Sequence, residues 1–196
     1  MRVRKSPEDR VGEILDTALR LFLERGFAEV QIEHIRAATG LSRGGIYHHF
    51  GSKSAVMQAL VEREQTALAL AAGPDLVALL TRGSAYLDAE PSVETSLTTR
   101  DEIALYLNYL EQAQDTHLAP LIEEALRRAG SLPMPADHAA QIVLAVNHRI
   151  NRKVLTGNWT KDETLAFTRS ALLACEAMLL KPGFFAPVLA ALDHSA

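Results

Sequence analysis

The stretch that decides the fold runs from Gln31 to Phe50 and reads QIEHIRAATGLSRGGIYHHF. Gly40 is a typical helix stop, and Ser42 is a good residue for capping a new helix. We therefore predict two short helices, 32–39 and 43–50, joined by a tight turn. Their small shared core is expected to contain Ile32, Ile35, Ala38, Leu41, Ile46 and Phe50. Such a helix-turn-helix can place its second helix in the major groove of DNA.

The outward face of the second helix is predicted to carry Arg43, Gly44, Tyr47 and His48. Gly44 and Gly45 are unusual, because each interior glycine costs a helix about 1 kcal/mol relative to alanine. Two explanations stay open. Either the backbone approaches a DNA groove closely, or the glycines permit close packing against the preceding helix.

A longer helix is predicted directly before the motif. Ser6 can cap it, Pro7 suits its first position, Asp9 completes a capping box and Gly26 ends it. Its apolar face is spaced at helical intervals: Val11, Ile14, Leu15, Ala18, Leu19, Phe22 and Leu23.

The remainder of the chain is also predicted to be helical, because no alternating strand pattern or hairpin turn is present. A helix capped by Ser52 should run to about Ala72, where Gly73 and Pro74 stop it. Further helices are expected at about 75–89, 98–114, 118–129, 136–156 and 161–180, with an amphipathic tail from Pro182. The fold class is therefore all-α, with about nine helices.

Charge and composition narrow the function. The chain of 196 residues is 48% apolar, which indicates a folded protein. Its formal net charge of −4 divides into +2 over residues 1–60 (9 basic, 7 acidic) and −6 over the remainder (11 basic, 17 acidic). A mildly basic end on an acidic body suggests that only the N-terminal part meets a polyanion. The single Cys175, the short apolar runs and the missing signal pattern lead us to expect a cytoplasmic protein without membrane partners.

No catalytic pattern was found. The seven histidines show no metal-ligand spacing, and no glycine-rich phosphate loop or nucleophile elbow is present. We expect no metal, no cofactor and no enzymatic activity.

Many of these residues resemble, in type and spacing, the DNA-binding domain of the tetracycline repressor (TetR) family. The matching positions are Ile14, Leu15, Ala18, Leu21, Phe22, Gly26, Phe27, Ile32, Ile35, Ala38, Gly40, Ser42, Gly45, Ile46, Tyr47, His49, Phe50 and Lys53. The resemblance covers about residues 8–68 and implies a homodimer that reads a pseudo-palindromic operator in double-stranded DNA. Residues 75–196 would then bind a small-molecule effector and form the dimer.

The resemblance implies particular DNA contacts. Arg43 would read guanine, and Tyr47 and His48 would bond phosphates or base edges. Ser42 and Lys53 would fix the register on the backbone.

Three further residues are candidates for DNA contact. Arg4 and Lys5 could reach a minor groove, or could simply form a solvated terminus. Gln31 departs from the family pattern, which usually has Ser or Thr there. Because Gln is a poor N-cap, either a neighbour caps the helix or Gln31 itself reaches DNA.

The body offers candidate ligand residues. Segment 98–114 is apolar nearly all round, which predicts a buried helix. The resemblance places the effector pocket among these helices, and the candidate polar groups are Tyr106, Tyr109, Gln114, Asn147 and Asn151. Each could instead be a satisfied polar group of the core or of the dimer interface.

Helices 136–156 and 161–180 carry apolar residues on more than one face and are predicted to form an intermolecular four-helix bundle. Repression relieved by an effector is the leading hypothesis for function. An architectural DNA-binding protein with a protein-binding body and a helical-bundle enzyme are the alternatives.

Overall fold

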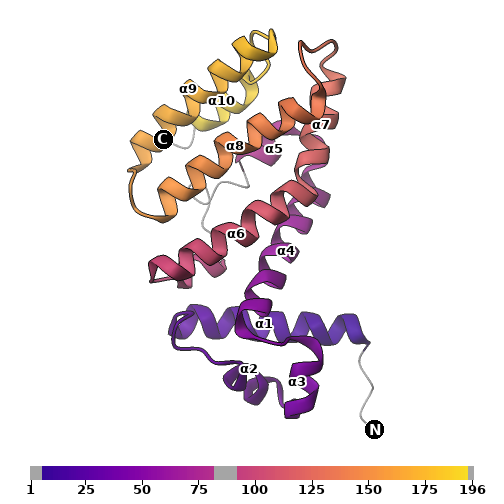
Figure 1. The fold of residues 1–196 in the computed structure, drawn as a ribbon, viewed down its shortest axis with the longest axis vertical. Coiled ribbons are helices and arrows are strands. Elements are labelled where there is room, and N and C mark those ends of the chain that lie inside the picture. Colours follow the sequence, from indigo (N-terminus) through magenta and orange to yellow (C-terminus); the bar gives the residue numbers. More distant parts are fainter. Residues whose placement is uncertain (1–5, 82–91, 194–196) are drawn as a thin grey trace. The chain divides into compact units, whose positions relative to one another are not determined.

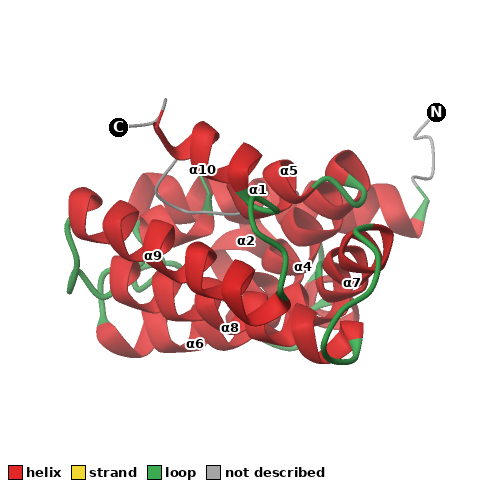
Figure 2. Ribbon diagram, turned by 90° about the horizontal axis from the view of Figure 1, so that it is seen from above, coloured by secondary structure: helices red, strands yellow, loops and turns green. Residues whose placement is uncertain are grey.

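The computed structural model describes residues 6–81 and 92–193, and within these ranges it contains only helices and the loops between them (Figures 1 and 2). This confirms the all-α class. The described elements are α1 Pro7–Arg25, α2 Ile32–Thr39, α3 Arg43–His49, α4 Lys53–Ala72, α5 Leu76–Thr81, the 3₁₀ helix η1 Val93–Ser96, α6 Arg100–His117, α7 Ala119–Arg128, α8 Ala136–Leu155, α9 Lys161–Leu179 and α10 Ala186–Asp193.

The described residues fall into two compact units. The first contains 6–63 and 92–106, and the second contains 64–81 and 107–193. Helices α4 and α6 therefore each contribute to both units. Our domain boundaries, 8–68 and 75–196, remain a prediction.

The first unit is built on α1, which packs against α2 and η1. Capping at both ends of α1 follows the prediction: Ser6 Oγ accepts a hydrogen bond from the Asp9 N–H, and the Asp9 carboxylate accepts one from the Ser6 N–H. Gly26, at φ 83°, ends the helix. The buried face of α1 consists of Ile14, Leu15, Ala18, Leu21 and Phe22. Leu21 thus takes the place expected of Leu23, which is partly exposed.

In the second unit, α8 packs against both α7 and α9, and α10 packs on α5 (Figure 1). Its buried core includes Leu79, Leu118, Ile122, Leu126, Val143, Leu144, Leu172, Leu179, Phe185 and Val188. The predicted C-terminal amphipathic segment is confirmed as α10, whose Val188 and Leu192 are buried.

Three local predictions need correction or limits. Helix α6 continues to His117, whereas the sequence predicted its end at about residue 114. Segment 93–96 forms a 3₁₀ turn that was not predicted. The second half of the helix expected at 75–89 lies outside the described residues. No helix in the described ranges is long and apolar enough to cross a membrane.

Glu176 fixes the C-terminal segment to α9. This buried carboxylate accepts hydrogen bonds from the N–H groups of Gly183, at 3.0 Å, and Phe185, at 2.6 Å. Both donors lie in the turn that leads to α10, and Phe185 is fully buried. The carboxylate therefore satisfies backbone donors that the turn itself leaves open.

We predict that Glu176→Ala lowers the free energy of unfolding by about 2–4 kcal/mol, because it strands buried backbone donors and opens a small cavity. Chemical denaturation measures this change. Asp162→Ala, which removes an exposed carboxylate from the same helix, is the control and should cost less than about 1 kcal/mol. Equal effects of the two substitutions would contradict the role assigned to Glu176.

Candidate nucleic-acid interface

The helix-turn-helix has the predicted local geometry. Gly40 adopts a left-handed conformation, with φ 67° and ψ 19°, and ends α2. Ser42 Oγ accepts a hydrogen bond from the Gly45 N–H at 3.1 Å and so caps α3. The predicted boundaries of both helices are confirmed to within one residue.

Burial separates the two faces of the motif. Ile35 and Ile46 are fully buried, and Phe50 is nearly so. Ala38 is exposed, contrary to the prediction, because Ile35 alone forms the buried face of the eight-residue α2. On α3, the side chain of Arg43 is 82% exposed and Tyr47 is 41% exposed. The residues expected to read DNA therefore lie on the solvent side of α3.

The two glycines of α3 differ in their surroundings. A Cβ added to Gly45 would lie 3.2 Å from Ser42 Oγ and 3.7 Å from the Leu41 side chain. Gly45 therefore allows the turn to pack closely on α3. A Cβ on Gly44 would meet nothing within 4 Å. No packing among the described residues requires Gly44, and close approach to DNA remains a prediction for it.

Gln31 does not cap α2 with its side chain. A neighbour supplies a bond instead: His34 Nδ1 accepts from the Gln31 N–H at 3.1 Å. The Gln31 side chain is exposed, so contact with DNA stays a prediction.

Lys53 serves the internal structure of the first unit. Its Nζ donates to the carbonyl oxygens of Phe27, at 2.6 Å, and Ala28, at 3.2 Å, and lies 4.2 Å from the centroid of the Phe27 ring. Desolvation lowers the pKa of Lys53, while Glu102 and Glu29 oppose that shift. The lysine thus ties the start of α4 to the loop after α1, a contact that was not predicted from the sequence. Its proposed phosphate contact is untested.

The remaining DNA candidates can be placed briefly. His48 is exposed and His49 is half-buried, with their rings 5.3 Å apart. Arg4 and Lys5 lie outside the described residues.

Glu33, which sequence reasoning did not select, connects the two helices of the motif. Its Oε2 accepts from Arg36 Nε at 2.8 Å. Its Oε1 accepts from the Tyr47 hydroxyl at 3.3 Å and lies 3.9 Å from Arg43 Nε. Two of the expected DNA-reading side chains therefore share one carboxylate.

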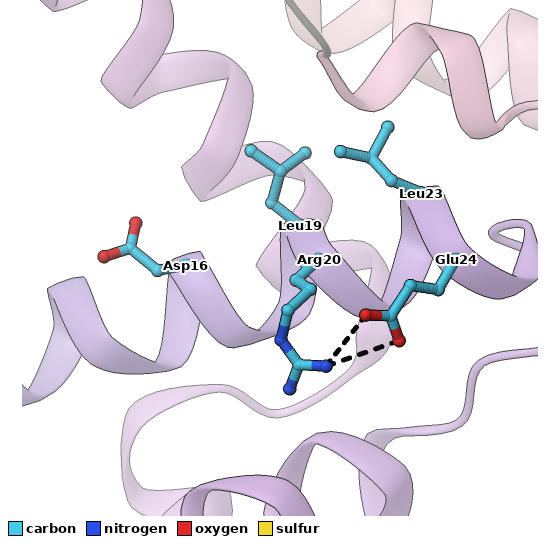
Figure 3. Close-up of a pocket in the computed structure, with 5 residues that line it drawn as sticks. All are labelled: Asp16, Leu19, Arg20, Leu23 and Glu24. Carbon is cyan, nitrogen blue, oxygen red and sulfur yellow. Dashed lines mark hydrogen bonds and ion pairs between the residues drawn. The ribbon is translucent and has the colours of Figure 1, made fainter.

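A surface cleft on α1 of about 420 Å³ is lined by residues of this helix alone (Figure 3). Figure 3 shows Leu19 and Leu23 pointing to one side, with Arg20 bonded to both carboxylate oxygens of Glu24. Asp16 pairs with Arg63. Each charged group that lines the cleft is thus already in an ion pair, and we assign no function to the cleft.

The candidate ligand residues separate into two groups. Tyr106 lies in the first unit, where its hydroxyl donates to Glu94 Oε2 at 2.7 Å. Gln114, Asn147 and Asn151 are buried in the second unit, and Tyr109 is half-buried there. Helix α6, which was expected to be buried on all sides, has one exposed face. This face is formed by Asp101, Ala104, Asn108, Gln112 and Asp115.

The three buried amides form a polar cluster with unused hydrogen-bonding capacity. Asn147 Nδ2 donates to Gln114 Oε1 at 3.4 Å. Among the described residues, Gln114 Nε2 and both polar atoms of the Asn151 side chain have no partner. Nearby on α8, burial lowers the pKa of His148, partly offset by Glu111 and Asp115, and its Nε2 also has no partner in the described part of the chain. The cluster therefore presents neutral donors and acceptors.

Within the described ranges, no group of three or more His, Cys, Asp or Glu side chains could hold a metal ion. A small cavity of about 20 Å³ adjoins Asn147 and is otherwise lined mainly by apolar residues of α5, α8, α9 and α10.

Comparisons with known proteins agree with this geometry. Residues 14–60 match the family model described as "Bacterial regulatory proteins, tetR family". The transcriptional regulator SrpR of Pseudomonas putida is 29% identical over 191 residues, covering 91% of this chain and 89% of SrpR. The repressor AcnR of Corynebacterium efficiens is 38% identical over 63 residues, but this match spans only 34% of AcnR.

Solved structures share the fold. GusR of Salmonella enterica superposes with a TM-score of 0.58 at 18% identity, covering 91% of this chain and all of GusR. A TetR regulator from Rhodococcus gives 0.57 at 19% identity, covering 89% and 98%. The family model therefore assigns residues 14–60, which contain the capped helix-turn-helix, to a TetR-type DNA-binding domain, and the chain is similar along nearly its full length to the transcriptional regulator SrpR.

Proposed function

We propose that the protein is a homodimeric repressor whose two α3 helices read the half-sites of a pseudo-palindromic operator and whose second unit binds a releasing effector. The observation that carries the DNA-binding part is the exposed face of α3, held in place by the buried Ile46 beneath it. AcnR, described as a transcriptional repressor, supports the direction of regulation.

In the proposed complex, Arg43 reads a base edge, because its planar guanidinium suits the two acceptors of guanine. Tyr47, His48 and Gln31 contact phosphates or bases beside it. Ser42 and Lys53 set the register on the backbone, and Gly44 permits close approach of α3. Arg4 and Lys5 are proposed to reach the adjacent minor groove.

Apolar side chains on α9 and just after it support the proposed dimer interface. Leu173 is 49% exposed, Met178 39% and Leu180 72%. Small residues continue the exposed face of α9: Ala166, Ser170, Ala174 and Ala177. A second copy of α8 and α9 would cover this face in a four-helix arrangement, as the sequence predicted.

The amide cluster of the second unit supports an effector site. A buried donor or acceptor without a partner costs about 1–3 kcal/mol, so a ligand that pairs with Gln114 and Asn151 recovers that energy. Asn147, which donates to Gln114, is proposed to line the same site. Tyr109 is proposed to line the same site. Because these groups are neutral and the pKa of His148 is lowered, the proposed effector is an uncharged molecule with hydrogen-bonding groups.

Helices α4 and α6 run from one unit into the other and are the proposed route of release. Release requires the effector to bind the DNA-incompetent arrangement of the dimer more tightly than the competent one. A complete switch needs a preference of about 5 kcal/mol.

We predict that Arg43→Ala weakens binding to the selected operator by about 1–3 kcal/mol and relaxes the base preference at one position in each half-site. Fluorescence anisotropy with single-base operator variants measures both effects. Arg128→Ala, which removes an exposed, paired arginine from the second unit, should leave them unchanged. Unchanged affinity and base preference in Arg43→Ala would disprove the assignment of α3.

Leu173→Glu should separate the dimer, because it places two charges in an apolar interface. Analytical ultracentrifugation is expected to show a monomer with weakened operator binding. Leu70→Glu alters a leucine that is 82% exposed on α4 and should remain dimeric. A dimeric Leu173→Glu protein would rule out this interface.

If Asn151 is kept for ligand binding at a cost in stability, Asn151→Leu should raise the free energy of unfolding of the ligand-free protein by about 1 kcal/mol or more. Thermal or chemical unfolding tests this. Asn108→Leu, on the exposed face of α6, should change it by less than about 0.5 kcal/mol. A clear loss of stability in Asn151→Leu would mean that the amide serves the fold.

A further inference from the structure

We propose that Glu33 sets the DNA specificity of this regulator. Its carboxylate interacts with Arg43 and Tyr47 and so disfavours their contact with the phosphates of non-operator DNA. This inference rests on the proposed role of α3 in reading DNA. It assigns a positioning and discriminating role to a residue outside the reading helix.

Glu33 is placed unusually for a carboxylate. It is the single acidic residue between Gln31 and Phe50, a segment that otherwise contains two arginines and three histidines. A carboxylate on a DNA-facing motif repels phosphates. Its presence there therefore calls for a compensating role.

The Glu33 carboxylate is anchored from within the motif. Arg36 Nη1 donates to the carbonyl oxygen of Leu41 in the turn at 3.2 Å, and Arg36 Nε donates to Glu33 Oε2 at 2.8 Å. The turn thus orients Arg36, and Arg36 orients the carboxylate. One oxygen of Glu33 is committed to this support.

The other oxygen faces the reading residues of α3. Oε1 accepts the Tyr47 hydroxyl at 3.3 Å and lies 3.9 Å from Arg43 Nε. The Arg43 guanidinium also lies 6.0 Å from the centroid of the Tyr47 ring. These distances are longer than those of strong charge-assisted bonds, so DNA can displace them.

The interaction of Glu33 with Arg43 disfavours complexes with non-operator DNA more than the complex with the operator. Non-specific binding draws its affinity from phosphates, where Arg43 contributes a single positive charge that Glu33 already attracts. At the operator, Arg43 instead gains a bidentate bond to a base edge, which compensates for leaving the carboxylate. Glu33 therefore lowers non-specific affinity and widens the gap between operator and random DNA.

The test compares Glu33→Gln with wild type on the selected operator and on a scrambled duplex of equal length, over a range of salt concentrations. Glu33→Gln should bind the scrambled duplex about twofold to fivefold more tightly at low salt, with a smaller gain on the operator. Because Arg43 is then free to neutralise one more phosphate, the slope of log K against log salt on the scrambled duplex should become steeper by about 1.

Three controls separate this role from general effects of charge or folding. Glu24→Gln makes the same charge change in an exposed ion pair on α1 and should leave the specificity ratio unchanged. Glu33→Asp, which keeps the charge, should retain the wild-type salt slope. In an Arg43→Gln background, Glu33→Gln should lose most of its effect, because its partner is gone.

An unchanged specificity ratio in a Glu33→Gln protein that unfolds at the wild-type denaturant concentration would overturn the inference. So would an equal effect of Glu24→Gln. Failure of the underlying function is distinguishable, because Arg43→Ala would then also leave operator binding unchanged.

Discussion

Two helices of eight and seven residues, α2 and α3, carry the proposed DNA-reading surface, yet helices this short do not persist in water alone. They depend on burying Ile35 and Ile46 within the first unit, where α1 packs on α2 and α2 on α3. Once Ile46 is inward, the period of the helix turns the adjacent Tyr47, about 100° further round, away from the core. Arg43 is exposed because it stands at the first position of α3, at the end of the helix. The orientation of the proposed contacts on α3 thus depends on that burial and on where the helix begins.

Local signals made much of the fold predictable from the sequence. Ser6, Asp9, Gly26, Gly40 and Ser42 act through bonds or dihedral angles within a few residues, so their roles are visible in the sequence. The side-chain contacts that join distant positions were not predictable. Lys53 reaches carbonyls about 25 residues away, and Glu33 reaches Tyr47 across the turn. Helix α6 was wrongly predicted to be buried on all sides. Its sequence is largely apolar, but residues at helical spacing form one exposed face.

In the second unit, too, local features were predictable from the sequence and contacts between distant residues were not. Asn147 and Asn151 were chosen as polar groups of the helices among which the resemblance places the effector pocket, and both are buried. The pairing of Asn147 with Gln114 on α6 depends on how α6 and α8 pack, which spacing does not specify. Tyr106, chosen by the same reasoning, belongs to the first unit and bonds Glu94. The proposed effector site consequently centres on amides and not on tyrosines.

The central claim is that α3 of each protomer reads one half of a symmetric site. Selection of bound sequences from a random duplex library by the purified full-length protein tests it most directly. The account predicts enrichment of an inverted repeat whose half-sites are centred about one helical turn, or a multiple of it, apart. No enrichment over the starting library, or a single unrepeated site, would contradict it.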